Sequence, residues 1–348
     1  MKSYDVVIIG ASAAGLTAAL TARRHYPEKS ILVIRKHELV PIPCGIPYSF
    51  GLAEKPENNL IPVSKIMAAN GIEGLVANVT EINRNSRTVS TENEETVSFD
   101  RLVIATGSRP IVPPIPGSDK KNVFPVEKDI PFLNTVVEKM DGSDSIVIVG
   151  CGFIGVEFAE ECRRRRPDMK IYVVEMLRHC LQLVYDEDLC EQAEKTLEQQ
   201  RVSLLLDEKV QEITGDEYVS GVNLASGKSI DADMVILGIG AFPDTELAEK
   251  AGLAMGPTEA IYVDRYMQTS DRYIFACGDN TEKVSFFDGK PSRYKLASIA
   301  TMEARVAGAN LFGITRVNMG VIGVYSTVLG DKAYAAAGLT HFQAEEKG

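Results

Sequence analysis

The residues most suited to carry out chemistry are one cysteine and two glycine-rich turns. Cys44 lies in the run PIPCGIPY at residues 41–48, and no second cysteine follows at CxxC or CxxxxC spacing. The glycine-rich turns, at residues 10–15 and 150–155, have the form of dinucleotide-binding fingerprints. Two nucleotide sites and one isolated thiol together suggest an electron path from a nicotinamide, through a flavin, to a single redox-active sulfur.

Each turn needs a strand before it and a helix after it. Residues 4–9 (YDVVII) are short and rich in β-branched side chains, which predicts a buried strand. The turn GASAAG follows, then a predicted helix over residues 16–26 that ends at Pro27, then a strand over 31–34. This βαβ unit has the usual length of about 30 residues.

The same pattern returns later in the chain. A strand is predicted over residues 145–149 (SIVIV), followed by the turn GCGFIG, a helix that runs to Arg166 before Pro167, and a strand over 170–175. The repeat indicates two nucleotide-binding units in one chain.

The second fingerprint is complete. Gly150 permits the tight turn, Gly152 lets the backbone approach the pyrophosphate, and Gly155 lets the helix pack closely on the strand. Glu175 stands about 20 residues further on, where an acid binds a ribose hydroxyl. A carboxylate there favours NADH, because it repels a 2′-phosphate. Arg178 is close enough in sequence to weaken this inference, so NADPH remains an alternative donor.

The first fingerprint departs from the pattern at two positions. Ser12 replaces the middle glycine, and Arg35 stands in the place of the ribose-binding acid. An arginine has no hydrogen-bond acceptor. Glu38 or main-chain carbonyl groups are therefore expected to take that role, unless adenosine binds differently here.

Two proline- and glycine-rich stretches divide the chain. Residues 109–117 predict a crossing between domains, and residues 238–244 predict the return. We expect an α/β protein with two Rossmann-like domains, the second inserted in the first. The predicted division is an FAD-binding domain over 1–113 and 244–320, an NAD(P)-binding domain over 114–243, and the start of a C-terminal domain over 321–348.

Composition narrows the function classes. A net charge of −11 argues against a nucleic-acid or anionic-membrane partner, and no apolar run is long enough to span a membrane. No cysteine pair has zinc-ligand spacing, no signal peptide is evident, and no metal site is expected. We therefore expect a cytoplasmic protein whose thiols are mostly reduced. Five cysteines are expected to be structural and unpaired: Cys151, Cys162, Cys180, Cys190 and Cys277.

Two further motifs identify a family. Residues 99–110 (FDRLVIATGSRP) resemble the ATG strand-turn of flavoproteins with two dinucleotide sites, and residues 269–279 (TSDRYIFACGD) resemble their late flavin motif. With the turn at residues 150–155 and Cys44, the chain resembles the pyridine nucleotide–disulfide oxidoreductases over about residues 4–340. The single cysteine before Gly-x-Pro-Tyr points to the branch of coenzyme A disulfide reductases, NADH oxidases, NADH peroxidases and persulfide reductases.

The resemblance implies FAD in the first unit and NAD(P)H in the second. The implied FAD contacts are Gly10, Ser12, Ala13, Ala14, Gly15, Arg35, Lys36, Val79, Ala105, Thr106, Gly107, Gly278, Asp279 and Ala297. The implied NAD contacts are Gly150, Gly152, Ile154, Gly155, Glu175 and Gly240. Phe153 matches an aromatic residue that shields the flavin, and Glu157 matches a carboxylate near the nicotinamide ring. A packed core aromatic and a solvated helix glutamate are the structural alternatives.

Cys44 also has a local argument. Pro47 predicts the first turn of a helix, whose N-terminal dipole would lower the pKa of a nearby thiol. Ala13 stands where peroxidase relatives carry a histidine, which makes peroxide chemistry less favoured. Arg24 matches a position that meets coenzyme A in relatives, and Arg305 is a second candidate; both could equally be solvated helix charges.

The resulting interpretation is an FAD-dependent NAD(P)H oxidoreductase. Electrons pass through the flavin to oxidised Cys44 and on to a small disulfide, persulfide, polysulfide or oxygen. Two alternatives remain open: a reductase for a small iron–sulfur protein, in which Cys44 is idle, and a non-enzymatic redox sensor. In the family a third domain forms the homodimer, and residues 323–338 resemble only its opening strands. We therefore expect an incomplete dimer surface and a poorly covered apolar strand face over residues 321–329.

Overall fold

The computed structural model describes residues 1–347 and contains two compact units. The first comprises Met1–Pro43, Ile61–Arg109 and Phe242–Gly323, and the second comprises Cys44–Leu60, Pro110–Ala241 and Val324–Gly348. Two segments fall differently from the predicted division. The segment that begins with Cys44 belongs to the second unit, and so does the C-terminal hairpin.

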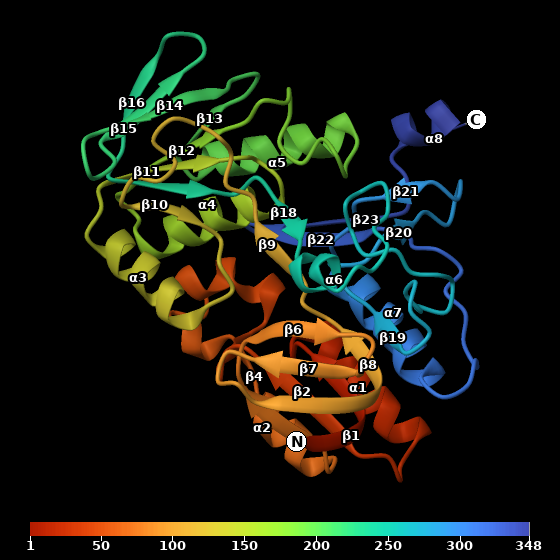
Figure 1. The fold of residues 1–348 in the computed structure, drawn as a ribbon. Helices are drawn as coiled ribbons and strands as arrows, with labels where there is room; N and C mark the ends of the chain where they lie inside the picture. Colours follow the sequence, from red (N-terminus) through yellow and green to blue (C-terminus); the bar gives the residue numbers. More distant parts are fainter. Residues whose placement is uncertain (348) are drawn as a thin grey trace. The chain divides into compact units, whose positions relative to one another are not determined.

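A parallel sheet forms the centre of the first unit (Figure 1). Strands β5 (Glu73–Val76), β2 (Ile31–Arg35), β1 (Lys2–Ile9), β8 (Thr96–Ile104) and β19 (Ile274–Ala276) pair in that order. An antiparallel hairpin of β6 (Val79–Asn83) and β7 (Thr88–Thr91) extends β8. Strands β1 and β8 carry fully buried Val, Ile and Leu side chains, as strands covered on both faces require.

Two helices pack closely against each other in this unit. Helix α1 (Ala13–His25) buries mainly alanines, and α7 (Ala297–Asn310) brings Gly308 against it. A Cβ atom added at Gly308 would lie 2.6 Å from the carbonyl oxygen of Ala18. Small residues on both helices therefore allow their backbones to approach.

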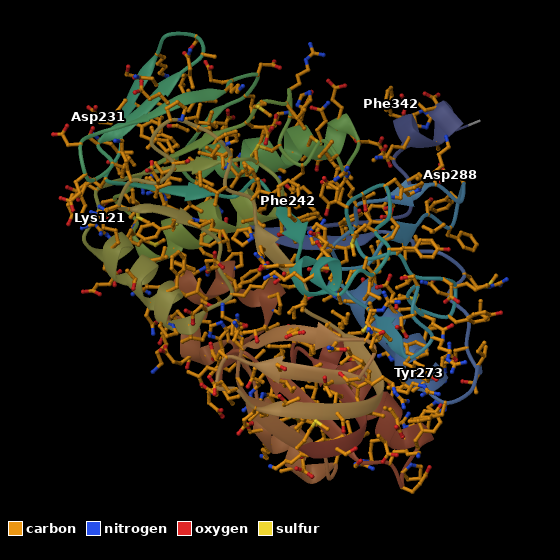
Figure 2. The ribbon with its side chains drawn as sticks, in the orientation of Figure 1. Lys121, Asp231, Phe242, Tyr273, Asp288 and Phe342 are labelled. Carbon is orange, nitrogen blue, oxygen red and sulfur yellow. A yellow bond between two sulfur atoms is a disulfide. The ribbon has the colours of Figure 1, made fainter. Side chains whose placement is uncertain are left out.

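An aromatic residue, Tyr273, lies directly before β19. Tyr273, labelled in Figure 2, is contacted by the guanidinium groups of Arg87, Arg101 and Arg272 at 4.8, 5.2 and 4.5 Å from its ring centroid. The Nε of Arg101 also donates to the carbonyl oxygen of Leu311, 2.6 Å away. These contacts fix the end of α7 relative to the sheet.

A second parallel sheet forms the centre of the second unit. Its strands pair in the order β10 (Val123–Pro125), β17 (Met234–Leu237), β11 (Ser145–Val149), β12 (Lys170–Val174) and β13 (Val202–Leu205). Helices α3 (Ile130–Asp141), α4 (Phe153–Arg165) and α5 (Glu187–Gln199) belong to this unit, with a small sheet of β14 (Val210–Thr214), β15 (Gly221–Leu224) and β16 (Ser229–Asp231).

The second unit also holds the hairpin of β22 (Val324–Leu329) and β23 (Lys332–Ala337), and helix α8 (His341–Lys347). Alternate residues of β22 differ in exposure: Thr327 and Leu329 are buried, whereas Val324 and Val328 are 53% and 52% exposed. The expectation of a poorly covered strand face therefore applies to one face of β22 only.

The shorter elements complete the chain. They are β3 (Val40–Pro41), η1 (Pro43–Gly45), η2 (Pro47–Phe50), η3 (Pro56–Asn58), β4 (Leu60–Ile61), α2 (Val63–Ala69), β9 (Ser108–Pro110), β18 (Ala241–Pro243), α6 (Glu246–Lys250), β20 (Lys283–Val284) and β21 (Pro291–Ser292). Among the described residues, no helix is long and apolar enough to cross a membrane. The predicted fold class, with two Rossmann-like units, is confirmed.

Candidate functional site

The glycine turn of the first unit has the backbone that a dinucleotide requires. Gly10 has φ +107°, and a Cβ added there would lie 2.2 Å from the carbonyl oxygen of Ala105. A Cβ at Gly15 would lie 2.0 Å from the carbonyl oxygen of Gly10. Helix α1 begins directly after Ser12, whose side chain does not cap it, and its first turn holds no acid. Its N-terminal N–H groups and dipole are therefore suited to a pyrophosphate.

The late flavin motif meets this turn. Gly278 has φ +94°, and a Cβ there would lie 2.8 Å from the side chain of Ala14. Asp279 accepts a hydrogen bond of 2.8 Å from the hydroxyl of Ser108, which follows the ATG turn. The predicted residues from three distant segments therefore gather at the carboxyl ends of β1, β8 and β19.

A buried ion pair holds the loop of that motif. The Lys283 ammonium lies 3.0 Å from the Glu303 carboxylate and also donates to the carbonyl oxygen of Thr281. Glu303 Oε2 accepts from the backbone N–H of Gly278 at 2.9 Å. Burial raises the pKa of Glu303, while Lys283 opposes the rise. Sequence reasoning missed this pair, because a Lys–Glu spacing of 20 residues carries no local signal.

Arg35 is buried and turned toward its own neighbours. Its guanidinium donates to Glu38 at 2.9 Å and to the Ser64 hydroxyl at 2.8 Å, while its Nε atom is buried with no hydrogen-bond partner among the described residues. Arg35 therefore holds Glu38 beside the end of β2, and the orphaned Nε leaves a donor for a bound group. The residues of the first unit fit FAD, and both expected ribose acceptors, Glu38 and main-chain carbonyl groups, stay predictions.

The glycine turn of the second unit repeats this construction. Gly150 has φ +99°, a Cβ at Gly155 would lie 1.9 Å from the Gly150 carbonyl oxygen, and a Cβ at Gly152 would meet no atom within 4 Å. The open space at Gly152 is what a close pyrophosphate needs. Glu175 accepts from the backbone N–H groups of Cys151 at 2.6 Å and Leu177 at 2.9 Å. The residues fit a nicotinamide dinucleotide.

One prediction about this turn is wrong. Cys151 and Cys180, expected to be structural and unpaired, form a disulfide. The segment after β12 returns to the glycine turn and brings the two Cα atoms within 4.8 Å. The pairing depends on this return, which residue spacing does not reveal.

Cys44 is exposed and lies in η1, just before η2. Pro47 does begin a helical segment, as predicted, but the segment is a four-residue 3₁₀ helix rather than an α-helix. So short a segment aligns few peptide dipoles, so the helix-dipole argument for Cys44 loses most of its basis.

A protonatable carboxyl group lies against the same segment. Glu157, on α4, accepts from the hydroxyls of Tyr48 at 3.3 Å and Thr327 at 3.0 Å. Burial raises the pKa of Glu157 to about 7, although both hydrogen bonds oppose the rise. The group can therefore hold or release a proton near neutral pH. The alternative of a fully solvated helix glutamate does not describe this environment.

Phe153 lies one turn before Glu157 on α4. Its ring stacks on Tyr325 at a centroid distance of 5.6 Å and meets Tyr185 edge-on at 5.9 Å. Tyr325 and Thr327 project from the same face of β22, since side chains two apart on a strand share a face. Sequence reasoning missed Tyr48, Tyr325 and Thr327. The period of two along β22 could show that Tyr325 and Thr327 share a face, but not that this face packs on α4.

The other predicted residues occupy varied environments. Thr106 donates to the carbonyl oxygen of Asp244 at 2.6 Å, and Gly107 and Gly240 have φ values of +78° and +99°. Val79 and Ala105 are buried, Lys36 is exposed, Ile154 lies in α4, and Ala297 begins α7. Arg24 and Arg305 are exposed on α1 and α7, which suits either a solvated charge or a contact with an anionic substrate.

Comparisons with known proteins agree with this architecture. The model of the family described as "Pyridine nucleotide-disulphide oxidoreductase" matches residues 4–304. An NADH oxidase of Methanocaldococcus jannaschii is 35% identical over 98% of this chain and 77% of its own length. A CoA-dependent NAD(P)H sulfur oxidoreductase of Pyrococcus furiosus is 33% identical over 100% of this chain and 79% of its own length.

Solved structures give the same result. An NAD-dependent persulfide reductase from A. fulgidus superposes with a TM-score of 0.91 at 33% identity, covering 98% of this chain. The chain spans 65% of the length of that protein. The predicted family and cofactors, FAD and NAD(P)H, are therefore confirmed, and the chain belongs to the pyridine nucleotide–disulphide oxidoreductase family.

Proposed function

We propose that this chain transfers electrons from NADH, through FAD, to Cys44 and from there to a small sulfur substrate. The observation that carries the proposal is the segment around Cys44. It presents one exposed cysteine, and four residues later Tyr48 is hydrogen-bonded to a carboxyl group that titrates near neutral pH. An exposed thiol, in a chain segment that also contacts a proton-holding group through Tyr48, is suited to thiol–disulfide exchange.

The protein's own part in this chemistry is binding, orientation and proton management. FAD, when bound, supplies the two-electron exchange between the nicotinamide and sulfur. The turn at Gly10 and the loop at Gly278 would hold FAD, and the turn at Gly150 with Glu175 would hold NADH. Glu157 would hold a proton beside the nicotinamide ring, with Tyr48 and Thr327 fixing its carboxyl group.

The acceptor is proposed to be a disulfide, persulfide or polysulfide, with coenzyme A as a candidate carrier. Ala13 offers no proton donor beside the glycine turn, which disfavours peroxide. The Pyrococcus furiosus relative is named a CoA-dependent sulfur oxidoreductase, and the A. fulgidus structure is a persulfide reductase. Exposed Arg24 and Arg305 would meet the phosphates of coenzyme A. Oxygen is the competing acceptor, since other relatives are named NADH oxidases.

Two further parts of the proposal concern the cellular form. A cytoplasmic location is proposed, and a homodimer is proposed from the family resemblance. The apolar face of β22 that contains Val324 and Val328 would take part in that association.

Turnover of Cys44→Ser tests the proposal. NADH oxidation should be compared with coenzyme A disulfide, polysulfide, peroxide, oxygen and an artificial dye as acceptors. The variant should keep FAD and dye reduction but lose nearly all sulfur reduction. Cys190→Ala, which alters a buried cysteine of the same unit, is the matched control and should keep both activities. Full sulfur turnover in Cys44→Ser would contradict the proposal.

A further inference from the structure

The disulfide of the second unit lies where a dinucleotide is expected to bind. Cys151 stands between Gly150 and Gly152, in the turn that joins β11 to α4, and Cys180 lies in the segment between β12 and α5. Both cysteines are fully buried. The bridge therefore links the pyrophosphate turn covalently to the segment that follows Glu175.

Hydrogen bonds join the same two segments. The backbone N–H of Cys151 donates to Glu175, and the backbone N–H of Leu181 donates to the carbonyl oxygen of Cys151 at 2.9 Å. The second oxygen of Glu175 accepts from Leu177. The bridge, the glycine turn and the proposed ribose-binding acid therefore form one connected assembly. A displacement of Cys151 would act on Glu175 directly, through the backbone N–H of Cys151.

The Cys180 side is anchored separately. The backbone N–H of Cys180 donates to Glu194 on α5 at 2.9 Å, and the ring of His179 lies 3.2 Å from the same oxygen. When the sulfurs are bonded, the segment is fixed at both sides. When they are reduced, hydrogen bonds and apolar packing still hold it to the glycine turn but no covalent bond does, and the geometry around Glu175 becomes less restricted. A preorganised site binds its ligand more tightly than a mobile one.

We propose that Cys151 and Cys180 are a second thiol–disulfide site, distinct from Cys44, whose oxidation raises the affinity of the second unit for NAD(H). In the oxidation, the two thiols give up two electrons and two protons to a low-molecular-weight disulfide. One mixed disulfide forms and releases one small thiol, and closure of the Cys151–Cys180 bond releases the other. A dithiol or phosphine reductant reverses the change. The inference rests on the proposed NADH site at Gly150–Gly155.

The buried position gives this site a different role from that of exposed Cys44. Exchange at buried sulfurs requires local opening, so it is slow compared with exchange at an exposed thiol. The bridge would therefore follow sustained changes in the small-disulfide pool rather than each turnover. More disulfide would give tighter nucleotide binding in an enzyme proposed to consume disulfide.

The test measures the Kd for NAD⁺, which cannot reduce the flavin, by calorimetry on FAD-loaded protein. All forms carry Cys44→Ser, so that the exposed thiol contributes nothing. The protein is oxidised with coenzyme A disulfide or reduced with a phosphine, and the reagent is then removed by gel filtration. Alkylation and mass spectrometry measure the fraction of protein in which the Cys151–Cys180 bridge is intact. We expect the oxidised form to bind NAD⁺ with a Kd lower by roughly fivefold or more, the usual range of coupling between two sites.

Two variants complete the design. Cys151→Ala with Cys180→Ala should bind as the reduced form does and show no response to the reductant. Cys190→Ala should respond as its parent does. Equal Kd values for the oxidised and reduced forms would overturn the inference while leaving the proposed function intact. This comparison requires no substitution of Cys151 or Cys180. Absence of NAD⁺ binding in every form would overturn both.

Discussion

Glu157→Gln offers a quantitative test of the carboxyl group beside Tyr48. Burial raises the pKa of Glu157 from the ordinary glutamate value of 4.5 to about 7. Between these two pH values the native state keeps a proton that the unfolded state has lost, so the free energy of unfolding falls as pH rises. A difference of about 2.5 pH units at 1.36 kcal/mol each gives a penalty of about 3 kcal/mol, fully present above pH 7 and absent below pH 4.5.

A glutamine in this place cannot ionise and should escape the penalty. Relative to the unmodified protein, Glu157→Gln should therefore gain about 3 kcal/mol between pH 4.5 and pH 8.5. Urea unfolding followed by circular dichroism measures this gain, since the chain has no Trp for fluorescence. Glu138→Gln, an exposed position of the same unit on α3, should show no such gain. A stability difference for Glu157→Gln that does not change with pH would refute the assigned burial of the charge.

Three other outcomes follow from the geometry. Glu175→Ala should narrow the preference for NADH over NADPH in kcat/KM, because it removes a ribose acceptor and a charge that repels the 2′-phosphate; a clear preference for NADPH in the unmodified protein would contradict the assignment. Gly15→Val should abolish FAD uptake, since its Cβ would lie 2.0 Å from the Gly10 carbonyl oxygen. Gly152→Ala should keep FAD and weaken only NAD⁺ binding. Retained flavin absorbance in Gly15→Val would refute the assignment of FAD to the first glycine turn. Lys283→Met should destabilise the protein by about 3–5 kcal/mol, because Glu303 loses its partner in a buried site. The double variant Lys283→Met with Glu303→Leu should recover much of that loss in thermal unfolding. Equal losses of stability in the single and double variants would show that the pair is not coupled.

Local sequence signals were sufficient for the nucleotide-binding elements. The strand predicted over residues 145–149 matches β11 to the residue, because its β-branched run and the following glycine mark both ends. Helices α1 and α4 begin at Ala13 and Phe153, inside the predicted turns rather than after them, since the helical backbone starts directly after the middle residue of each turn. The glycines and the acid were predictable because each answers a backbone or hydrogen-bonding need, whereas the ATG turn was identified from the family resemblance.

The missed features all depend on contacts between distant segments. The Cys151–Cys180 bridge requires the chain after β12 to return to the glycine turn. The contacts of Tyr325 and Thr327 require β22 to pack on α4, which no pattern within residues 324–329 specifies. The helical start at Pro47 was predicted, but the kind and length of the helix were not, because a proline marks the start of a helical turn and does not decide whether the turn continues as an α-helix.

The most direct test of the central claim is the redox state of Cys44 before and after NADH. The FAD-loaded protein is first oxidised with coenzyme A disulfide, then treated anaerobically with excess NADH, denatured, alkylated and mapped peptide by peptide. Cys44 should change from blocked to alkylated after NADH, and the same treatment of Cys44→Ser should expose no new thiol in that peptide. If Cys44 is equally alkylated with and without NADH while dye reduction proceeds normally, Cys44 lies outside the electron path and the account is contradicted.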